Sequence, residues 1–370
     1  MNTNLTQTRR TRIPILRAVV VLAVLTVITG AFAWRAYEGS AAALYEKSGV
    51  TVSRINDRGQ VVGTLTRGWV SHGFVWKKGS LKRLGLVEAD AINDRGEVLG
   101  TNVYSQNVLW ENGRAKRVRL NCVDGLNNRG QVLGSAGPPG GDCIRESPAL
   151  WTNGRISSLP FDGDLDVAMN DKGQVIGVLP DGHIGEWQGG KVTDLGPGTP
   201  IAINDHGEIL GSGSNGDVTV WQNGIATDIG PGQPVAINER GQVIGIQEIT
   251  ARILQAFRWS NGTLTHLGSG YSIPTAISKS GQVVGYTLRD GLQQGFVWQD
   301  GTMTRLPAPK GHRGRPTRAV AINDHNQIVG DDCYALAGGC TRNGGPRGYA
   351  VLWTLHGRRI KTLQIAKGHS

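Results

Sequence analysis

The sequence contains few cysteines and none of the short motifs that mark common catalytic or metal-binding sites. Its four cysteines form no C-x-x-C pair, which argues against structural zinc and against thioredoxin-like redox chemistry. G-x-S-x-G, H-E-x-x-H, a Walker-type phosphate loop and G-x-G-x-x-G at a strand–helix junction are also absent. The sequence therefore indicates no metal, no cofactor and no catalytic residue.

Long hydrophobic runs are lacking as well, with one exception close to the N-terminus. Residues 18–33 are almost wholly apolar and uncharged, and they follow a segment with four arginines and no acidic residue. Sixteen residues make roughly 24 Å of helix, slightly short of the ~30 Å hydrocarbon core of a bilayer. Ala31-Phe32-Ala33 has the small-x-small form that a signal peptidase accepts. Residues 1–33 are thus expected to be either a cleaved signal peptide or a retained signal anchor, the latter holding the protein in the membrane through residues 13–34.

Both alternatives predict an exported protein that is extracellular, periplasmic or anchored facing away from the cytoplasm. The even number of cysteines fits an oxidising compartment. Two local disulfides are predicted, Cys122–Cys143 and Cys333–Cys340. Residues 34–50 are expected to form a tether, residues 51–365 a repeat domain, and residues 366–370 a tail.

Glycine, in contrast, is abundant, with 55 residues, and much of it belongs to a repeated nine-residue phrase. The clearest copy is Ile-Asn-Asp-His-Gly-Glu-Ile-Leu-Gly at 203–211. The eight copies begin at Ile55, Ile92, Leu126, Met169, Ile203, Ile237, Ile277 and Ile322. The fifth position is Gly in seven copies and Asn326 in the last, as expected for a residue with φ > 0. Asn and Asp before it can close a turn through bonds to backbone N–H groups. The phrase therefore predicts a strand, a tight turn and a strand.

A second, looser phrase contains one tryptophan and follows each copy of the first. The eight tryptophans are Trp76, Trp110, Trp151, Trp187, Trp221, Trp259, Trp298 and Trp353. In five cases Asn-Gly or Asp-Gly follows after one intervening residue, and this pair is the strongest signal for a two-residue β-hairpin. A tryptophan repeated in this way is expected in the core.

Each repeat thus predicts two hairpins, or four short strands, in as few as 34 residues. We predict an all-β fold, an eight-bladed β-propeller of four-stranded repeats preceded by one N-terminal hydrophobic helix; seven blades or an open β-solenoid are the alternatives. The first hairpin, from Val52, and the last, from Tyr349, could complete one blade between them and so join the two ends of the chain.

The alternation of Gly-Phe-Val-Trp, a Leu-Gly ending and Ala-Ile-Asn-Asp-x-Gly-Gln-Val-Val-Gly resembles the HAF-repeat family of exported bacterial proteins. The resemblance covers residues 52–363 and implies a propeller-like fold. The His-Ala-Phe triplet that names the family is replaced here, for instance by His72-Gly73-Phe74. The family implies no particular activity.

Length varies mainly in the links between hairpins, and these links are expected on one face of the ring. Two long links contain most of a predicted basic binding cluster: Lys310, His312, Arg313, Arg315, Arg318, Arg342 and Arg347. Arginine suits carboxylate, sulfate or phosphate because its planar fork can bond in pairs. The absence of interleaved aromatic residues argues against nucleic acid.

The sequence favours a non-enzymatic binding module of the cell envelope or extracellular space, with an acidic glycan or a protein as partner. The alternative is a lyase or hydrolase acting on polysaccharide, because propellers can carry catalytic residues scattered over their loops. Neither the ligand nor an oligomeric state follows from the sequence.

Overall fold

The chain divides into two compact units, residues 1–43 and 44–370. The computed structural model describes residues 48–67, 70–137, 146–162, 166–251, 253–312, 314–332, 348–357 and 359–367, all of which belong to the second unit. The N-terminal hydrophobic helix and the tether that the sequence predicts therefore lie outside the described residues, apart from the end of the tether. Within the described ranges, no helix has the length and hydropathy needed to span a bilayer.

All regular secondary structure in the described residues is strand, and each sequence repeat supplies four consecutive antiparallel segments. The first three repeat units comprise β1 (Ser48–Ile55), β2 (Val61–Arg67), β3 (Val70–Lys77), β4 (Ser80–Arg83); β5 (Glu88–Ile92), β6 (Val98–Thr101), β7 (Asn107–Glu111), β8 (Arg114–Arg117); and β9 (Val123–Leu126), β10 (Gln131–Ala136), β11 (Ser147–Thr152), β12 (Arg155–Ser158). The fourth and fifth units share the long strand β16 and comprise β13 (Ala168–Met169), β14 (Val175–Val178), β15 (His183–Gln188), β16 (Lys191–Ile203), β17 (Ile209–Gly213), β18 (Val218–Gln222) and β19 (Ile225–Gly230). The last three comprise β20 (Gln233–Ile237), β21 (Val243–Thr250), β22 (Ile253–Ser260), β23 (Thr263–His266); β24 (Ser272–Ile277), β25 (Val283–Arg289), β26 (Leu292–Gln299), β27 (Thr302–Arg305); and β28 (Thr317–Ile322), β29 (Gln327–Asp332), β30 (Tyr349–His356), β31 (Arg359–Lys367).

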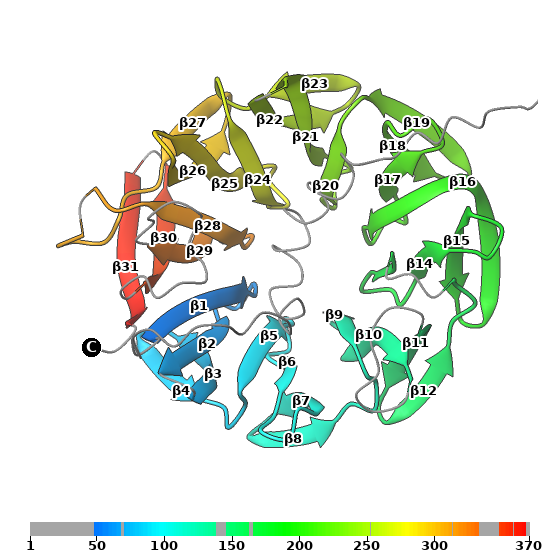
Figure 1. Cartoon of the computed structure of the whole chain (residues 1–370), viewed down its shortest axis with the longest axis horizontal. Helices are drawn as coiled ribbons and strands as arrows, with labels where there is room; N and C mark the ends of the chain where they lie inside the picture. The colour runs from blue at the N-terminus through cyan, green and yellow to red at the C-terminus, as the bar shows by residue number, and fades with distance from the viewer. Residues whose placement is uncertain are drawn as a thin grey trace, which may run out of the picture. The chain divides into compact units, whose positions relative to one another are not determined.

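The units stand around a common axis, and the first strand of each unit lies nearest to it (Figure 1). Within a unit, the first and third strands both run antiparallel to the second, so the turns that follow them lie at the same end. We call this end, which carries the Asn-Asp-x-Gly turns and the tryptophan hairpins, the turn face. The connections after the second and fourth strands lie at the opposite end, the link face, as the sequence predicts.

The second-position side chain closes each turn, as asparagine in seven copies and as Ser278 in the seventh, which confirms the prediction from the sequence. Asn56 Oδ1 accepts hydrogen bonds from the backbone N–H groups of Arg58, at 3.1 Å, and Gln60, at 2.9 Å. Gly59 has φ +67°, and Asn326, the exceptional residue at this position, has φ +61°. Asparagine tolerates this left-handed conformation better than other non-glycine residues do, which explains why it replaces glycine there.

The same asparagines also join successive units. Asn56 Nδ2 donates to the main-chain oxygen of Asn93 at 2.8 Å, and the pattern continues from Asn93 to Asn127 and onward. The series is interrupted at Ser278, whose shorter side chain bonds within its own turn, and Asn323 Nδ2 then joins the last unit to the first by donating to the oxygen of Asn56 at 3.0 Å. The first and last units are therefore held by the same hydrogen bond that joins their neighbours.

The third-position side chains form a second set of bonds between units, which the sequence did not predict. The carboxylate of Asp94 accepts the N–H of Asp57 at 2.8 Å, rather than a bond from its own turn. The later steps use Asn128, Asp171, Asp205 and Glu239 as acceptors. These residues are thus ties between repeats as well as turn formers.

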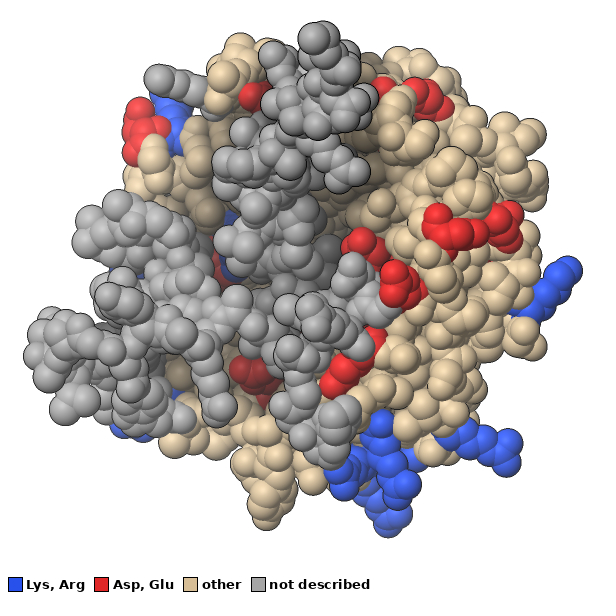
Figure 2. Space-filling view, turned by 45° about the vertical axis from the view of Figure 1, so that its right-hand side comes forward, with Lys and Arg blue, Asp and Glu red and all other residues tan. Residues whose placement is uncertain are grey.

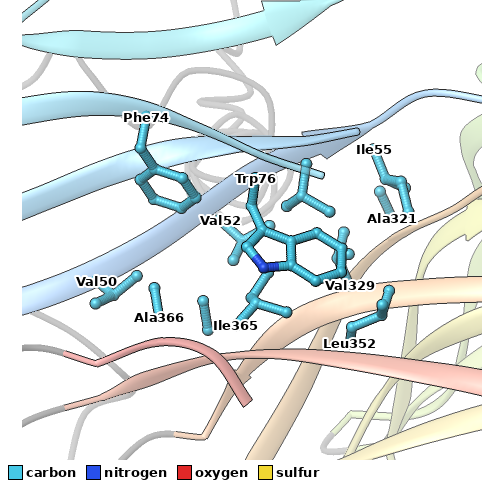
Figure 3. Packing of buried hydrophobic residues seen from close by; sticks show 12 residues of the cluster. Val50, Val52, Ile55, Phe74, Trp76, Ala321, Val329, Leu352, Ile365 and Ala366 are labelled. Atoms are coloured by element: carbon cyan, nitrogen blue, oxygen red, sulfur yellow. The ribbon is translucent and has the colours of Figure 1, made fainter. Parts of the chain in front are cut away.

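The core consists of clusters shared between neighbouring units. Trp151 and Trp353 are completely buried, which confirms the prediction that the repeated tryptophan is a core residue. Figure 3 shows the cluster that joins the first and last units, in which Trp76 and Phe74 pack with Leu352 and Ile365. Burial of large apolar side chains of this kind contributes roughly 1.5–3 kcal/mol each.

The prediction that the first and last hairpins share one blade was wrong. β1–β4 form a complete four-stranded sheet, and β28–β31 form four consecutive strands of another. The last unit is connected instead to its predecessor, through one parallel pairing between Gln294 and Thr317. Side-chain packing and the turn-face hydrogen bonds hold the two ends together, so strand exchange between the termini is not needed.

The ninth position of the phrase is glycine in every copy, and in seven units the start of the first strand of the same unit approaches it closely; in the fourth unit the ring of Phe161 approaches Gly177 instead. A Cβ built on Gly330 would lie 1.9 Å from the main-chain oxygen of Arg318, and one on Gly134 would lie 1.9 Å from that of Cys122. The first strand is irregular at this point, as between Ala319 and Ala321. Glycine is required there for space and not for its dihedral freedom.

Candidate functional site

The predicted basic cluster lies on the link between the seventh and eighth units. Lys310 is exposed, whereas His312, Arg315 and Arg318 are partly buried. The remaining members, Arg313, Arg342 and Arg347, fall outside the described residues. The link is fixed to the seventh unit by Thr317, whose hydroxyl donates to the oxygen of Leu306 at 3.0 Å.

The structure brings His312 and Arg315 together against one aromatic ring. The imidazole of His312 lies 4.3 Å from the ring of Tyr349, centroid to centroid, and the guanidinium of Arg315 lies 5.9 Å from it. Below them, the carboxylate of Asp332 is buried, 3.8 Å from His312 Nδ1, and it accepts the N–H of Tyr349 at 2.7 Å. Burial raises the pKa of Asp332 to about 6, with a smaller contribution from Asp331.

Arg318 lies apart from this group. Its guanidinium is paired with the carboxylate of Asp331 at 3.0 Å, an interaction that raises the pKa of Arg318. The predicted basic residues therefore do not form one cluster. His312 and Arg315 pack on Tyr349, whereas Arg318 forms an ion pair with Asp331.

Cys122 is the only cysteine in the described part of the chain. It is buried at the entrance to the third unit and is not a free thiol. Cys143, Cys333 and Cys340 lie outside the described residues, so the two pairings stay predictions.

A second group of titratable residues, which the sequence reasoning missed, lies on the innermost strands. Glu88 and Asp90 flank buried Ala89 on β5, and the register of the strand shifts between Ala89 and Ala91, at Asp90. Asp124 holds the position equivalent to Asp90 on β9, the innermost strand of the next unit, and β5 contacts β9.

Neighbouring atoms crowd these carboxyl groups although they remain accessible to solvent. Desolvation, together with the nearby charge of Glu88, raises the pKa of Asp90 to about 7. Desolvation also raises the pKa of Asp124 to about 6 and raises that of Glu88. Asp90 is thus half protonated near neutral pH, as a proton donor in catalysis must be. The sequence did contain one sign of this group, namely two acidic residues at alternate positions of an inner strand.

Acidic residues also gather elsewhere on the propeller, in one case beside a histidine. Figure 2 shows acidic side chains in separate groups on the side that Figure 1 shows at the right. Among the described residues, Asp181, His183 and Asp194 are close enough to hold a metal ion. They also satisfy one another, because His183 Nδ1 lies 3.0 Å from both oxygens of Asp194, and the hydrogen bond to Asp194 raises the pKa of His183. We therefore interpret His183 and Asp194 as an exposed ion pair and not as part of a metal site.

Comparison with known proteins identifies the fold. No protein-family model matches the chain, and no curated protein matches it. An acylaminoacyl peptidase in complex with Z-Gly-Gly-Phe-chloromethyl ketone is 12% identical, with a TM-score of 0.50, over 86% of this chain and 52% of the peptidase. The Pyrococcus horikoshii acylaminoacyl peptidase is 14% identical with a TM-score of 0.49, covering 78% of this chain and 58% of that one. The β-propeller domain of the Trilobed protease from Pyrococcus furiosus is 11% identical with a TM-score of 0.48, covering 88% and 97%.

The chain is a β-propeller. It spans little more than half the length of the two acylaminoacyl peptidases, and at these identities the likeness shows the fold alone.

The prediction of a non-enzymatic binding module is corrected at this point. The solved chains that it resembles include peptidases, so the comparison does not support a non-enzymatic module. Within this chain, the carboxyl groups on β5 and β9 have the raised pKa values expected of acid–base residues. The alternative, a propeller that is itself a lyase or hydrolase, agrees better with these findings.

Proposed function

We propose that the chain is an enzyme that hydrolyses a polysaccharide, with its acid–base residues on the innermost strands near the link face. The observation that carries the proposal is the pair formed by Glu88 and Asp90 on β5, in which desolvation and the charge of Glu88 raise the pKa of Asp90 to about 7. Cleavage of a glycosidic bond needs one carboxyl group that is protonated at the working pH and a second that is ionised.

In this proposal Asp90 is the general acid that protonates the leaving oxygen. Glu88 or Asp124 is the ionised carboxylate, because the pKa of Asp124, at about 6, lies below that of Asp90. Such acid–base catalysis typically contributes 10²–10⁴-fold to the rate. Arg315 and Lys310 add positive charge to the link face and would favour an acidic polysaccharide as substrate.

We further propose that the eight repeat units are eight blades of a closed ring. The support is the hydrogen bond from Asn323 to Asn56 and the packing of Trp76 with Leu352, which join the eighth unit to the first. An open stack would leave the inner strands of both terminal units exposed.

The remaining expectations from the sequence are part of the same proposal. We propose membership of the HAF-repeat family on the strength of the eightfold phrase, and export on the strength of residues 1–33. An extracellular or periplasmic location would place the enzyme where polysaccharides of the cell envelope are found.

The test is to incubate the full chain with a panel of neutral and acidic polysaccharides and to measure new reducing ends. Asp90→Asn should lower the rate at least 100-fold. Asp290→Asn is the matched control, because this acid lies on another part of the link face, at φ +52°, a conformation that asparagine tolerates. The proposal fails if no polysaccharide is cleaved, or if Asp90→Asn is as active as the wild type.

Two parallel measurements distinguish other chemistries. Products with ultraviolet absorbance from a new C=C bond would indicate elimination, and therefore a lyase. Cleavage of acylated peptides instead of polysaccharides would indicate the chemistry named for the matched peptidases.

A further inference from the structure

A small pocket lies on the turn face, between the sixth, seventh and eighth units, far along the strands from the link-face carboxyl groups. Its volume is about 270 Å³. Its walls come from the end of β22, the phrase turn of the seventh unit, the end of β26 and the turn residue Asn326 of the eighth unit. This position separates it from the proposed catalytic residues.

The pocket exists because the seventh copy of the phrase departs from the pattern. The fourth position is a long side chain in every other copy: Arg58, Arg95, Arg129, Lys172, His206, Arg240 and His325. In the first two copies the arginine reaches over the next turn, as Arg95 Nη1 does in donating to the oxygen of Arg129 at 3.0 Å. The seventh copy has Ser280, which is too short to cover the next turn and leaves the space open.

A second departure places a positive charge in this space. The residue before the repeated tryptophan is apolar in six units, but it is Arg258 in the sixth. The guanidinium of Arg258 lies 5.3 Å from the ring of Trp298. A Cβ built on Gly281 would lie 3.2 Å from Arg258 Nη2, so the guanidinium adjoins the open turn.

Arg258 is also left with an unused donor. Its Nε–H is buried and makes no hydrogen bond to any described residue. A buried donor of this kind destabilises the folded state when no partner satisfies it. Because Nε is closed off from solvent, a carboxylate in the pocket would meet the two Nη groups, whose planar fork also matches its two oxygens.

The rest of the wall is a row of linked polar side chains. Gln282 Nε2 donates to Gln299 Oε1 at 3.0 Å, and Gln299 Nε2 donates to the carboxylate of Asp300 at 3.2 Å. Amide and carboxylate oxygens of this kind accept hydrogen bonds from hydroxyl groups. The pocket is smaller than the roughly 300–1,000 Å³ of sites for drug-sized ligands, so it has room for a single ring.

We infer that this pocket binds one residue of a sugar acid, with its carboxylate on Arg258 and its hydroxyl groups on Gln299 and Asp300. The inference does not rest on the proposed hydrolysis, since the two sites lie on opposite faces and use different residues.

The test is to measure binding of D-glucuronate to the full chain by isothermal titration calorimetry or saturation-transfer NMR. D-glucose, which has the same ring without the carboxylate, and N-acetylalanine, which has a carboxylate without the ring, are the comparison ligands. Glucuronate should bind at least tenfold more tightly than either.

Two substitutions that restore the repeat's own residues should each weaken this binding at least tenfold. Arg258→Leu removes the guanidinium and introduces the residue found at the same position in the second and third units, Leu109 and Leu150. Ser280→Arg fills the pocket with the side chain of the first three copies. Both variants use residues that the fold accommodates elsewhere, so the unfolding temperature should change little.

The alternatives give distinct results. Absence of glucuronate binding, or unchanged binding by both variants, would overturn the inference. Equal binding of glucose would refute the role of the carboxylate, and tighter binding of N-acetylalanine would show a site for peptide carboxylates instead. Polysaccharide cleavage by Ser280→Arg at the wild-type rate would confirm that this site and the proposed catalytic site are separate.

Discussion

The side-chain amide of Asn323 donates a hydrogen bond to the main-chain oxygen of Asn56, a residue 267 positions earlier in the chain. The side-chain oxygen of Asn323 accepts two backbone N–H groups of its own turn, that of His325 at 3.1 Å and that of Gln327 at 3.0 Å. One buried asparagine thus fixes a turn and joins the last repeat unit to the first.

Asn323→Ala should destabilise the protein by about 1–3 kcal/mol, because it leaves buried backbone groups without partners in two units. Urea denaturation of the full chain measures the change. Asn326→Gly, in the same turn, is the control: it restores the glycine of the other copies at φ +61° and should be neutral or slightly stabilising. If both variants lose the same amount of stability, the loss comes from the geometry of the turn and not from the hydrogen bond to Asn56.

Ser278→Asn should have the opposite effect. Asn238 donates to the oxygen of Ser278 at 2.8 Å, but the shorter Ser278 bonds within its own turn, to Ser280 and Gln282. An asparagine there can donate to the oxygen of Asn323 and complete the series. We expect a gain of about 0.5–1.5 kcal/mol, measured by the same denaturation, since a net hydrogen bond contributes this much. A loss of stability would mean that the seventh unit is displaced from the spacing of the others.

Gly330→Ala should be among the most damaging single changes. The added Cβ would lie 1.9 Å from the oxygen of Arg318, so the two strands must separate. We expect a loss above about 3 kcal/mol, or failure to fold, observed as a lower unfolding temperature or as insoluble protein. Gly113→Ala is the matched control: its Cβ meets nothing within 4 Å, and its cost should be limited to about 1 kcal/mol for the φ of +84°.

Asp332→Asn should stabilise the protein at neutral pH. Burial raises the pKa of Asp332 from 3.8 to about 6, so the folded state binds this proton more tightly than the unfolded state does. The carboxyl group therefore lowers stability progressively as the pH rises from about 4 to about 6, and asparagine removes that cost while keeping an oxygen for the N–H of Tyr349. We expect a gain of about 1–2 kcal/mol at pH 7.5 that disappears near pH 3.5. A gain that is independent of pH would contradict this explanation.

The proposed hydrolysis should lose activity as the pH rises through about 7. Asp90 must be protonated to act as an acid, and its pKa is raised to about 7, so the protonated fraction falls above that value. The rate of appearance of reducing ends between pH 4 and 10 gives the profile. Glu88→Gln removes the neighbouring charge that helps to raise this pKa, and it should move the alkaline limb to lower pH as well as reduce the rate. An alkaline limb that stays in place would assign the titration to another group.

The sequence was sufficient to predict the all-β fold, the turns and the common face of the links. These features are local, or follow from repetition: Asn56 and Gly59 act within one turn, and alternate strands must point the same way. The tie from Asn323 to Asn56 and the contact of Asp94 with the preceding unit could not be read from one repeat, because both depend on the distance between repeats. The raised pKa of Asp90 was equally inaccessible, since it depends on atoms that other units bring around the carboxyl group.

The repeat also indicated where to look for ligands, though not at the residues first chosen. The basic residues of the link were selected by charge alone, and the structure pairs Arg318 with Asp331 and packs Arg315 on Tyr349. Ser280 and Arg258 were visible as exceptions to the pattern, but their sequence positions did not show that they meet in one pocket.

The bond from Asn323 to Asn56 has the same form as those between units that are consecutive in the chain, and this has a consequence for chain connectivity. None of the interactions between described residues at this join requires that the polypeptide begin or end there. Joining residue 367 to residue 48 by a short linker and opening the chain at another link, such as that between β19 and β20, should give a circularly permuted protein with the same set of contacts. The order in which the units are synthesised would then differ, while the folded molecule would not.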